Sequence, residues 1–444
     1  MRRSLPSLLL IAVAMTGGSA ASAPAQDDTA EPVRAFVGAR LLPVSGPPIE
    51  DGVLVVADGK IVAVGARGAV SIPAGATTVD ASGKTIIPGL ICTHSHLGRG
   101  GGGDSSGPIQ PEADIYDSIN VRNAGFKRAV AGGLTSINVM PGSGHLISGQ
   151  TVYLKLRGKE TIDEMIFRDA EGKRLGGLKM ANGTNSIRSA PFPGTRAKSA
   201  ALVRQKYIEA REYLQKIEDA EGDPEKLPPR NLSLEPLVQA MQGNRVVHHH
   251  THRHDDILTV LRLAEEFGFR VVLHHVSEAW KVAEEIAAAN AACSLILIDS
   301  PGGKLEARDI DYRNGAILEA RQVPVAFHTD DWITDSRLFL RMAALAVRAG
   351  MTREGALRSL TLAGAEMLDL ADRIGSLDVG KDADFAILSG DPFSVYTKIL
   401  ETWVEGTRVF DRSNPEDLLY AEGGFGAGDD KVFQGCCIEL GRGQ

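Results

Sequence analysis

Several features that mark whole classes of protein are scarce or missing in this chain of 444 residues. Its 4 cysteines are too few for a disulfide scaffold at this length. Acidic residues outnumber basic ones by 56 to 48, and no run rich in lysine or arginine occurs, so nucleic acid is not an expected partner. After the amino-terminal segment, no apolar run reaches the roughly 20 residues that a membrane-spanning helix needs. The composition, with 43% hydrophobic residues, is that of a globular protein with a sizeable core.

The first residues have the pattern of a targeting segment. Arg2 and Arg3 precede an apolar stretch at 8–15, and small residues follow at 21–25. We therefore expect residues 1–25 to be a signal peptide. The mature protein would then be exported, periplasmic or secreted, with no integral membrane span.

Both ends of the remaining chain have strand character. Short alternating runs in 33–87 are interrupted by Asp58-Gly59, which is a strong hairpin signal. Strand-like runs return in 373–412, and we expect these two segments to form one small β-sandwich domain. Residues 413–444 are interpreted as a Gly-rich tail, in which the disulfide state of Cys436 and Cys437 is left open.

Between these ends, residues 88–372 alternate strand-like runs with helical patterns. Two helical stretches, 256–267 and 278–289, have apolar residues at three- and four-residue spacing. Counting the run at 85–91 as the first, the strand-like runs number eight; the others are 135–140, 152–156, 178–181, 245–251, 270–275, 294–298 and 324–329. This alternation predicts an α/β fold of the (β/α)8 TIM-barrel type.

Histidine is also scarce, at 11 residues, yet it gathers where these strands end. His94 and His96 are one residue apart, and strand side chains at i and i+2 share a face, so both rings can reach one metal ion. Barrel enzymes place their reactive groups at the carboxyl ends of strands. The fifth, sixth and eighth predicted strands end in further candidates, which are His250 and His252, His275, and Asp330.

Neutral imidazoles with one carboxylate are the ligands that zinc prefers, and an open position for water makes such a site catalytic. Water bound to the metal ionises near neutral pH. Asp330 is our candidate for taking the proton of that water and passing it to a leaving nitrogen. Cys92 shares the strand face of His94 but is expected to be a core thiol. No Gly-x-Ser-x-Gly elbow occurs in a suitable strand context, which argues against a covalent acyl-enzyme.

The segment 88–96, PGLICTHSH, resembles the HxH signature of the amidohydrolase superfamily. The likeness covers nearly the whole mature chain and is greatest to the imidazolonepropionase-like and prolidase-like branch. It includes the segments 133–137, 141–145, 250–257 and 324–330, and GSLDVGKDAD at 375–384.

This resemblance implies roles for individual residues. His94, His96 and Asp330 would bind the more buried metal, and His250 and His275 would bind a second ion or complete the first. His250 is preferred to His252 because His250-Thr251-His252-Arg253 resembles an H-x-H-R run whose first histidine is the ligand. His248 and His249 are expected inside the strand, and His254 in a loop or at a helix start.

Two-metal members of the superfamily bridge their ions with a carboxylated lysine. Lys179 lies in a run similar to the I-K-x-M-A of the prolidase-like branch, and Lys155 is a second candidate. Whether the protein binds one zinc ion or two stays open. Substrate contacts are expected from His145, His252 and Arg253, and Arg188 is a further cation that could meet a substrate carboxylate.

The resemblance implies a metal-dependent amidohydrolase that cleaves the carbon–nitrogen bond of an amide, a small peptide or a cyclic amide. Export favours a peptide substrate and the prolidase-like side of the branch. Two alternatives are a deaminase that uses the same metal site and a non-catalytic scaffold or binding protein on an inherited barrel. The expected partner is a small molecule or small peptide, and the protein is a possible homo-oligomer.

Overall fold

The computed structural model describes residues 32–99, 103–104, 106–297, 304–331 and 333–423. The predicted signal peptide and the cysteines at 436 and 437 lie outside these residues. Among the helices within the described ranges, none combines the length and the apolar character that crossing a membrane requires.

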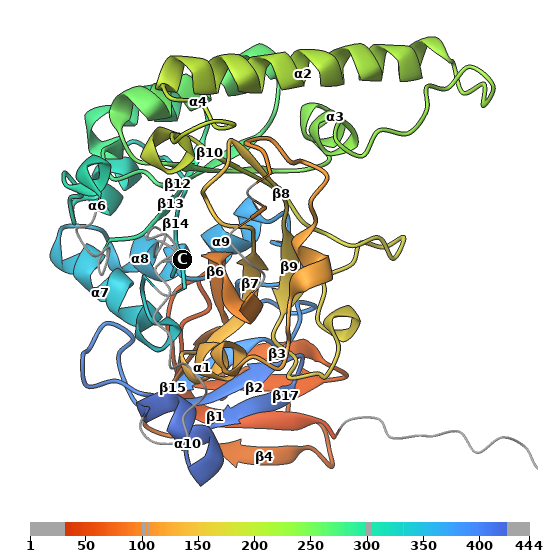
Figure 1. Ribbon diagram of the computed structural model, residues 1–444. Coiled ribbons are helices and arrows are strands. Elements are labelled where there is room, and N and C mark those ends of the chain that lie inside the picture. Colours follow the sequence, from red (N-terminus) through yellow and green to blue (C-terminus); the bar gives the residue numbers. More distant parts are fainter. Residues whose placement is uncertain (1–31, 100–102, 105, 298–303, 332, 424–444) are drawn as a thin grey trace, which may run out of the picture. The chain divides into compact units, whose positions relative to one another are not determined.

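Strands from both ends of the chain pair in one sheet, which lies at the bottom of Figure 1. Its order is β17-β16-β15-β5-β1-β2-β3, and β4 pairs with β1. The bounds are β1 Arg34–Leu41, β2 Ile49–Ala57, β3 Lys60–Ala66, β4 Thr77–Asp80, β5 Thr85–Pro88, β15 Phe385–Leu388, β16 Ile399–Val404 and β17 Thr407–Asp411. The arrangement of these strands as a two-layer sandwich stays a prediction.

The predicted Asp58-Gly59 hairpin is confirmed, because β2 and β3 pair antiparallel with Ala57 opposite Lys60. Asp58 and Gly59 have φ values of 49° and 73°. Two consecutive positive φ values are those of a type I′ turn, whose twist matches that of the strands it joins. On one face of the sheet the rings of Phe36, Phe385 and Trp403 pack together, with centroids 5.0 to 5.6 Å apart.

A second group of strands carries the histidines. The strands β10 to β14 are parallel, in the order β14-β13-β12-β11-β10, and β8 adds to β10 antiparallel. A smaller sheet has the order β6-β7-β9. The bounds are β6 Leu90–Ser95, β7 Leu134–Val139, β8 Ile147–Gln150, β9 Val152–Lys155, β10 Leu178–Ala181, β11 Val247–Thr251, β12 Val271–His275, β13 Ala292–Leu295 and β14 Val325–Phe327.

The third predicted barrel strand differs from expectation. It forms as β9, but it pairs antiparallel with β7, so it is not a parallel strand of the predicted kind. A parallel neighbour needs a crossover of a dozen or more residues, usually a helix. The short connection from β7 to β9 contains β8 and no helix. The structure therefore shows a mixed α/β fold with parallel strands at its centre.

Helices cover these strands, and the long helix α2 runs along the top of Figure 1. The α-helices are α1 Ala124–Ala131, α2 Arg196–Asp219, α3 Glu235–Met241, α4 His254–Phe267, α5 Ala283–Ala288, α6 Asn314–Glu319, α7 Phe339–Arg348, α8 Arg353–Ser359, α9 Leu362–Met367 and α10 Pro415–Glu422. Short 3-10 turns are η1 Leu97–Arg99, η2 Ile115–Ser118, η3 Ile162–Glu164, η4 Gly183–Ser186, η5 Ala279–Lys281, η6 Leu305–Ala307 and η7 Ser336–Leu338.

The two helices predicted from apolar spacing form differently. The first is α4, which buries Ile257, Val260 and Leu261 and ends at Gly268 in the left-handed conformation that caps many helices. His254 is its first residue, as predicted. The second is split into η5 and α5 by Val282, whose φ of −136° and ψ of 31° are not helical.

Candidate metal centre

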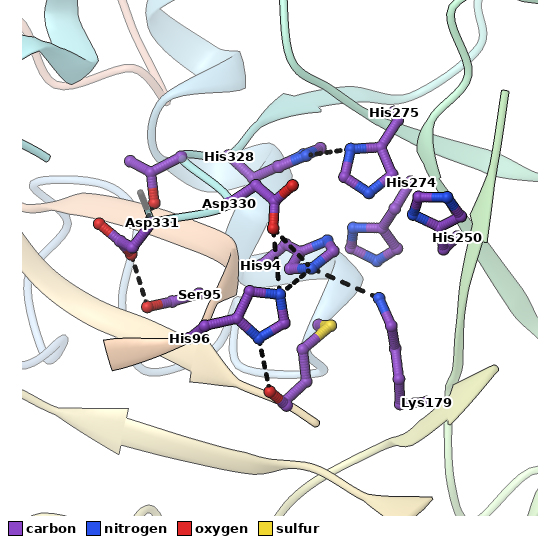
Figure 2. Close-up of polar contacts among 12 residues, drawn as sticks. His94, Ser95, His96, Lys179, His250, His274, His275, His328, Asp330 and Asp331 are labelled. Atoms are coloured by element: carbon purple, nitrogen blue, oxygen red, sulfur yellow. Dashed lines mark hydrogen bonds and ion pairs between the residues drawn. The ribbon is translucent and has the colours of Figure 1, made fainter. Parts of the chain in front are cut away.

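Three side chains from β6 and the end of β14 converge at the centre of Figure 2. The Nε2 atoms of His94 and His96 are 3.1 Å apart. The Oδ1 atom of Asp330 lies 3.0 Å from Nε2 of His96 and 3.4 Å from Nε2 of His94. Ligands of a tetrahedral zinc ion, at 2.0 to 2.1 Å from the metal, are about 3.3 Å from one another. The three donor atoms are therefore spaced as the ligands of one divalent cation are.

Their positions follow from the strands that carry them. His94 lies in β6 and His96 directly follows it, and the alternation of the extended backbone turns both rings to one side. The backbone N–H of Asp330 donates to the carbonyl oxygen of His94 at 3.1 Å, which joins the carboxyl end of β14 to β6. The ring Nδ1 of His96 lies 2.8 Å from the carbonyl oxygen of Met140, just after β7. These contacts hold the three donors in place.

His275 extends the cluster from β12. Its ring centroid is 4.9 Å from that of His94, and its Nδ1 lies 3.1 Å from Nε2 of His328. The donor atoms of His94, His275 and Asp330 all lie within 4.8 Å of one another. His275 and Asp330 have positive φ values of 70° and 47°, an uncommon conformation for residues other than glycine. Such backbone strain often accompanies functional sites.

A second group of donors lies beside the first. Its members, His250, His252 and Glu306, have donor atoms within 4.8 Å of one another. The ring centroid of His250 is 4.4 Å from that of His275, so the two groups are continuous. Nδ1 of His250 and Nε2 of His275 are buried and make no hydrogen bond within the described part of the chain. Unsatisfied buried ring nitrogens are rare, and these two are placed as metal donors would be.

Of the two candidate lysines, Lys179 lies in the cluster. It is fully buried on β10, with Nζ 3.4 Å from Nε2 of His94. Lys155 instead points toward the carboxyl-terminal segment, where it contacts Asp382 and lies 3.1 Å from Asp384 and 3.2 Å from Glu405. The second candidate is therefore part of an ion-pair network apart from the histidines.

Three residues near the cluster were missing from the predicted ligand set. His274 and His328 form a group with His94 whose donor atoms lie within 4.8 Å of one another. The pair at 274–275 was an available signal, and His328 ends a predicted strand, but the sequence offered no rule to rank them. Glu306 comes from η6, and no periodic signal in the sequence marked it.

Hydrogen bonds orient several of these rings. Ser294 Oγ lies 2.7 Å from Nδ1 of His328 and 2.5 Å from Thr93 Oγ1. His248 lies inside β11, as predicted, with Nδ1 3.0 Å from Nε2 of His274 and Nε2 3.1 Å from the hydroxyl of Tyr153. Such outer contacts fix which ring nitrogen faces the centre.

Burial keeps these imidazoles neutral. It lowers the pKa of His248, His249 and His328 to about 3 from 6.5. Burial also holds the pKa well below 6.5 for the rings grouped around the centre, with smaller contributions from neighbouring positive charges, and these rings are His94, His250, His252, His274 and His275. Neutral imidazole is the form that binds a metal.

The carboxylate of Asp330 is ionised in this setting. Burial raises its pKa, but the contact with His96 outweighs that effect, with smaller contributions from His328 and Lys179, and the pKa lies below its ordinary value. The site thus combines the neutral ring of His94 with one negative oxygen donor.

The neighbouring Asp331 supports the strand ends. It accepts hydrogen bonds from Ser95 Oγ at 2.6 Å and Thr329 Oγ1 at 2.7 Å, and it also contacts Ser336. Cys92 is buried, and its thiol lies 3.2 Å from Thr329 Oγ1. Burial raises the pKa of that thiol to about 12, so it is a protonated core group.

Of the three residues predicted to contact substrate, His252 lies in a candidate metal group, whereas His145 and Arg253 lie outside these groups within the described residues. His252 belongs to the second donor group, with Nδ1 2.8 Å from Ser277 Oγ. His145 is buried beside Phe192, with ring centroids 5.3 Å apart. Arg253 precedes α4 and makes two 2.9 Å hydrogen bonds to Asp255. Within the described residues, neither His145 nor Arg253 belongs to a candidate metal group.

Comparisons with known proteins identify the family of this chain. A family model described as the amidohydrolase family matches residues 236–410. The solved structure of an amidohydrolase from Thermotoga maritima MSB8 has a TM-score of 0.79 and 31% sequence identity, over 85% of this chain and 100% of that chain. The imidazolonepropionase of Sphingopyxis alaskensis is 25% identical over 415 residues, which are 84% of this chain and 96% of that protein.

Amidohydrolase tasK of Hapsidospora irregularis is 24% identical over 393 residues, which are 82% of this chain. The match spans only 39% of the length of that relative. The Thermotoga amidohydrolase is matched over its whole length at 31% identity, and the family model matches residues 236–410, so this chain belongs to the amidohydrolase superfamily of hydrolases.

Proposed function

We propose that this protein is a metal-dependent amidohydrolase that cleaves the carbon–nitrogen bond of an amide, a small peptide or a cyclic amide. The observation that carries the proposal is the convergence of three donor atoms, from His94, His96 and Asp330, at separations of 3.0 to 3.4 Å. A scaffold protein would have no need to keep these buried donors together, because buried polar groups without a ligand are costly.

The donor set fits a divalent metal, most simply zinc, because neutral imidazoles and one carboxylate are its preferred ligands. His94, His96 and Asp330 would hold one ion. His250 and His275 would complete it or hold a second, with Lys179 as a further ligand once carbon dioxide has converted its amine to a carbamate. A bound metal would lower the pKa of water and polarise the carbonyl under attack.

We assign proton transfer in this reaction to the side chain of Asp330. The Asp330 carboxylate is ionised, so it can accept a proton from the attacking water and deliver it to the departing nitrogen. In the overall reaction one C–O bond forms and one C–N bond breaks, and water supplies the hydroxyl of the acid and the hydrogen of the amine. His96 contacts the same carboxylate oxygen and keeps it oriented.

We extend the proposal to architecture and location. The hydrogen bond from Asp330 to His94 supports closure of the strands into a barrel of the TIM type in which β9 runs antiparallel to β7. The pairing of strands from both ends of the chain in one sheet supports the small β-sandwich domain. The amino-terminal sequence pattern supports export, which cell fractionation with an intact and a truncated leader would test.

The function is tested by metal analysis of the purified protein together with a hydrolysis panel of N-acyl amino acids, dipeptides and cyclic amides. We expect one or two divalent ions per chain and release of a free amine or ring-opened product. Release of ammonia from amino-purines or pyrimidines, without amide hydrolysis, would instead identify a deaminase. Metal-free protein with no activity on any compound would support a binding protein.

A further inference from the structure

Lys304 is a cation on the segment between β13 and η6. Its side chain is partly exposed, but its Nζ atom is buried and makes no hydrogen bond or ion pair among the described residues. A buried ammonium group without a compensating anion is strongly destabilising. Proteins keep such a group when a ligand supplies the missing charge.

Lys304 lies on the segment that contributes Glu306 to the second donor group. Two residues later, Glu306 joins the donor group of His250 and His252, with donor atoms within 4.8 Å. Between them Leu305 is 83% exposed, so the segment lies at the protein surface, with the side chain of Glu306 buried and that of Lys304 partly exposed. Burial is the largest influence that lowers the pKa of His250 and His252, and the charge of Lys304 is the next. Because Lys304 is two residues from Glu306, whose carboxylate lies within 4.8 Å of the donor atoms of both rings, it belongs to the segment that borders His250 and His252.

Glu306, the acidic residue nearest to Lys304 in the sequence, does not neutralise the Lys304 ammonium group. Glu306 accepts a hydrogen bond from the backbone N–H of Thr184 at 2.8 Å and lies 3.4 Å from Arg196 Nη2. Its other oxygen, Oε1, has no hydrogen-bond partner among the described residues and makes no ion pair with Lys304. The positive charge of Lys304 thus stays available for a ligand.

The cations favoured from the sequence are engaged elsewhere. Arg253 is held by Asp255 through two hydrogen bonds. The guanidinium of Arg188 lies 3.8 Å from the centroid of the Phe192 ring and contacts the carbonyl oxygen of Gly144. Neither is placed as a buried, uncompensated charge beside the histidines.

We propose that Lys304 binds a carboxylate of the substrate, and that the protein selects amides that carry an anionic group beside the scissile bond. This rests on the proposed function, because it assigns the substrate class of the same site. The closeness of Lys304 to His250 and His252 places the carboxylate near the reacting bond, as in an N-acyl amino acid or a dipeptide.

The test compares N-acetyl amino acids with the matching carboxamides in the wild type and in Lys304→Met. We expect the wild type to prefer the carboxylate substrate by about 10- to 100-fold in kcat/KM, the value of one charge-assisted hydrogen bond, and Lys304→Met to lose that preference. The control Lys226→Met removes a lysine whose side chain is 69% exposed, and this variant should keep the preference for the carboxylate substrate. The melting temperature of Lys304→Met should equal or exceed that of the wild type, because a buried unpaired charge is removed.

A binding experiment tests the carboxylate site at Lys304 separately from the proposed amide hydrolysis. Calorimetry with a dipeptide analogue whose amide is reduced to an amine, and with its carboxamide twin, measures recognition without hydrolysis. Discrimination in the wild type that is lost in Lys304→Met supports the carboxylate site even if no amide is cleaved. Amide hydrolysis with equal rates for both members of the pair would overturn the carboxylate site and leave the proposed function standing. A fall in melting temperature would show a structural role for Lys304 and would also overturn it.

Discussion

The carboxylate oxygen Oδ1 of Asp330 lies 3.0 Å from Nε2 of His96, although the two residues belong to opposite ends of the central segment. The contact exists because β6 and the end of β14 are adjacent, and the backbone hydrogen bond from Asp330 to His94 reinforces it. It brings an ionised carboxylate to the place where both histidine donors point.

Asp330→Asn should abolish most of the activity. The amide cannot accept the proton of the attacking water, so we expect kcat to fall by at least about 100-fold, the size of a general acid–base contribution. Steady-state kinetics with parallel metal analysis measure the effect. The matched control is Asp309→Asn, which changes a carboxylate that is 36% exposed and paired with Lys281. Comparable kinetics in Asp330→Asn and the wild type would exclude the proposed proton transfer.

Metal removal should inactivate and destabilise the protein. A ligand that binds only the folded state adds about 2.7 kcal/mol to the free energy of unfolding at one hundred times its dissociation constant. We therefore expect a chelator to lower the melting temperature and readdition of zinc to restore it. His94→Ala should lose bound metal, whereas His254→Ala, at the exposed start of α4, should keep it. Full metal content in His94→Ala would rule out the ligand set proposed above.

Lys155→Met should lower the free energy of unfolding without changing the candidate metal centre. Lys155 is fully buried among carboxylates, and removal of one partner of a buried ion pair costs about 3–5 kcal/mol. Lys60→Met is the matched control, because Lys60 is 47% exposed and pairs with the same Asp382 at 2.6 Å, which predicts a loss of about 1 kcal/mol or less. Chemical denaturation of both variants measures the difference. Equal losses would mean that burial does not strengthen this network.

The effect of Lys155→Met should depend on pH. Burial raises the pKa of Asp382 and Glu405, but Lys155 and the hydrogen bonds to these carboxylates outweigh it, and both values are lowered. A lowered carboxyl pKa stabilises the fold above its ordinary value and loses that effect as pH falls through the lowered one. The stability gap between the wild type and Lys155→Met should therefore narrow below about pH 4. A difference in the free energy of unfolding that does not change with pH would contradict the role of ionised Asp382 and Glu405 as partners of Lys155.

The buried histidines predict acid sensitivity of the metal-free protein. His248, His249 and His328 have a pKa of about 3 in the folded chain against 6.5 ordinarily, because burial disfavours the charged ring. Between these values the unfolded chain binds more protons, so the free energy of unfolding falls as pH drops from 6.5 to 3. Urea titrations across this range measure the slope, and His248→Gln should make it shallower. An unchanged slope in that variant would show that His248 does not contribute.

Local rules predicted much of the framework. The Asp58-Gly59 hairpin follows from turn chemistry, since both residues adopt positive φ. The spacing of Ile257, Val260 and Leu261 predicted α4. Alternation along a strand predicted that His94 and His96 would face one way. Each of these depends on residues that are neighbours along the chain.

Pairing between distant segments could not be predicted in this way. The direction of β9 depends on which neighbour it meets, and it meets β7 antiparallel. Likeness to a family run favoured Lys179 and left Lys155 as the second candidate. The fold directs Lys179 toward His94 and Lys155 toward the carboxyl-terminal acids.

The sequence by itself determined the residue types, the strand ends that carry them, the likeness to amidohydrolases and the metal chemistry that those donors favour. The tertiary structure decided which donors meet. Glu306 lies in the three-residue turn η6 and Lys304 directly precedes it. So short an element has no periodic pattern in the sequence, and only the packed fold brings this segment beside His250 and His252. Periodicity orients side chains within one element, whereas the distance between elements is set by sheet register and packing.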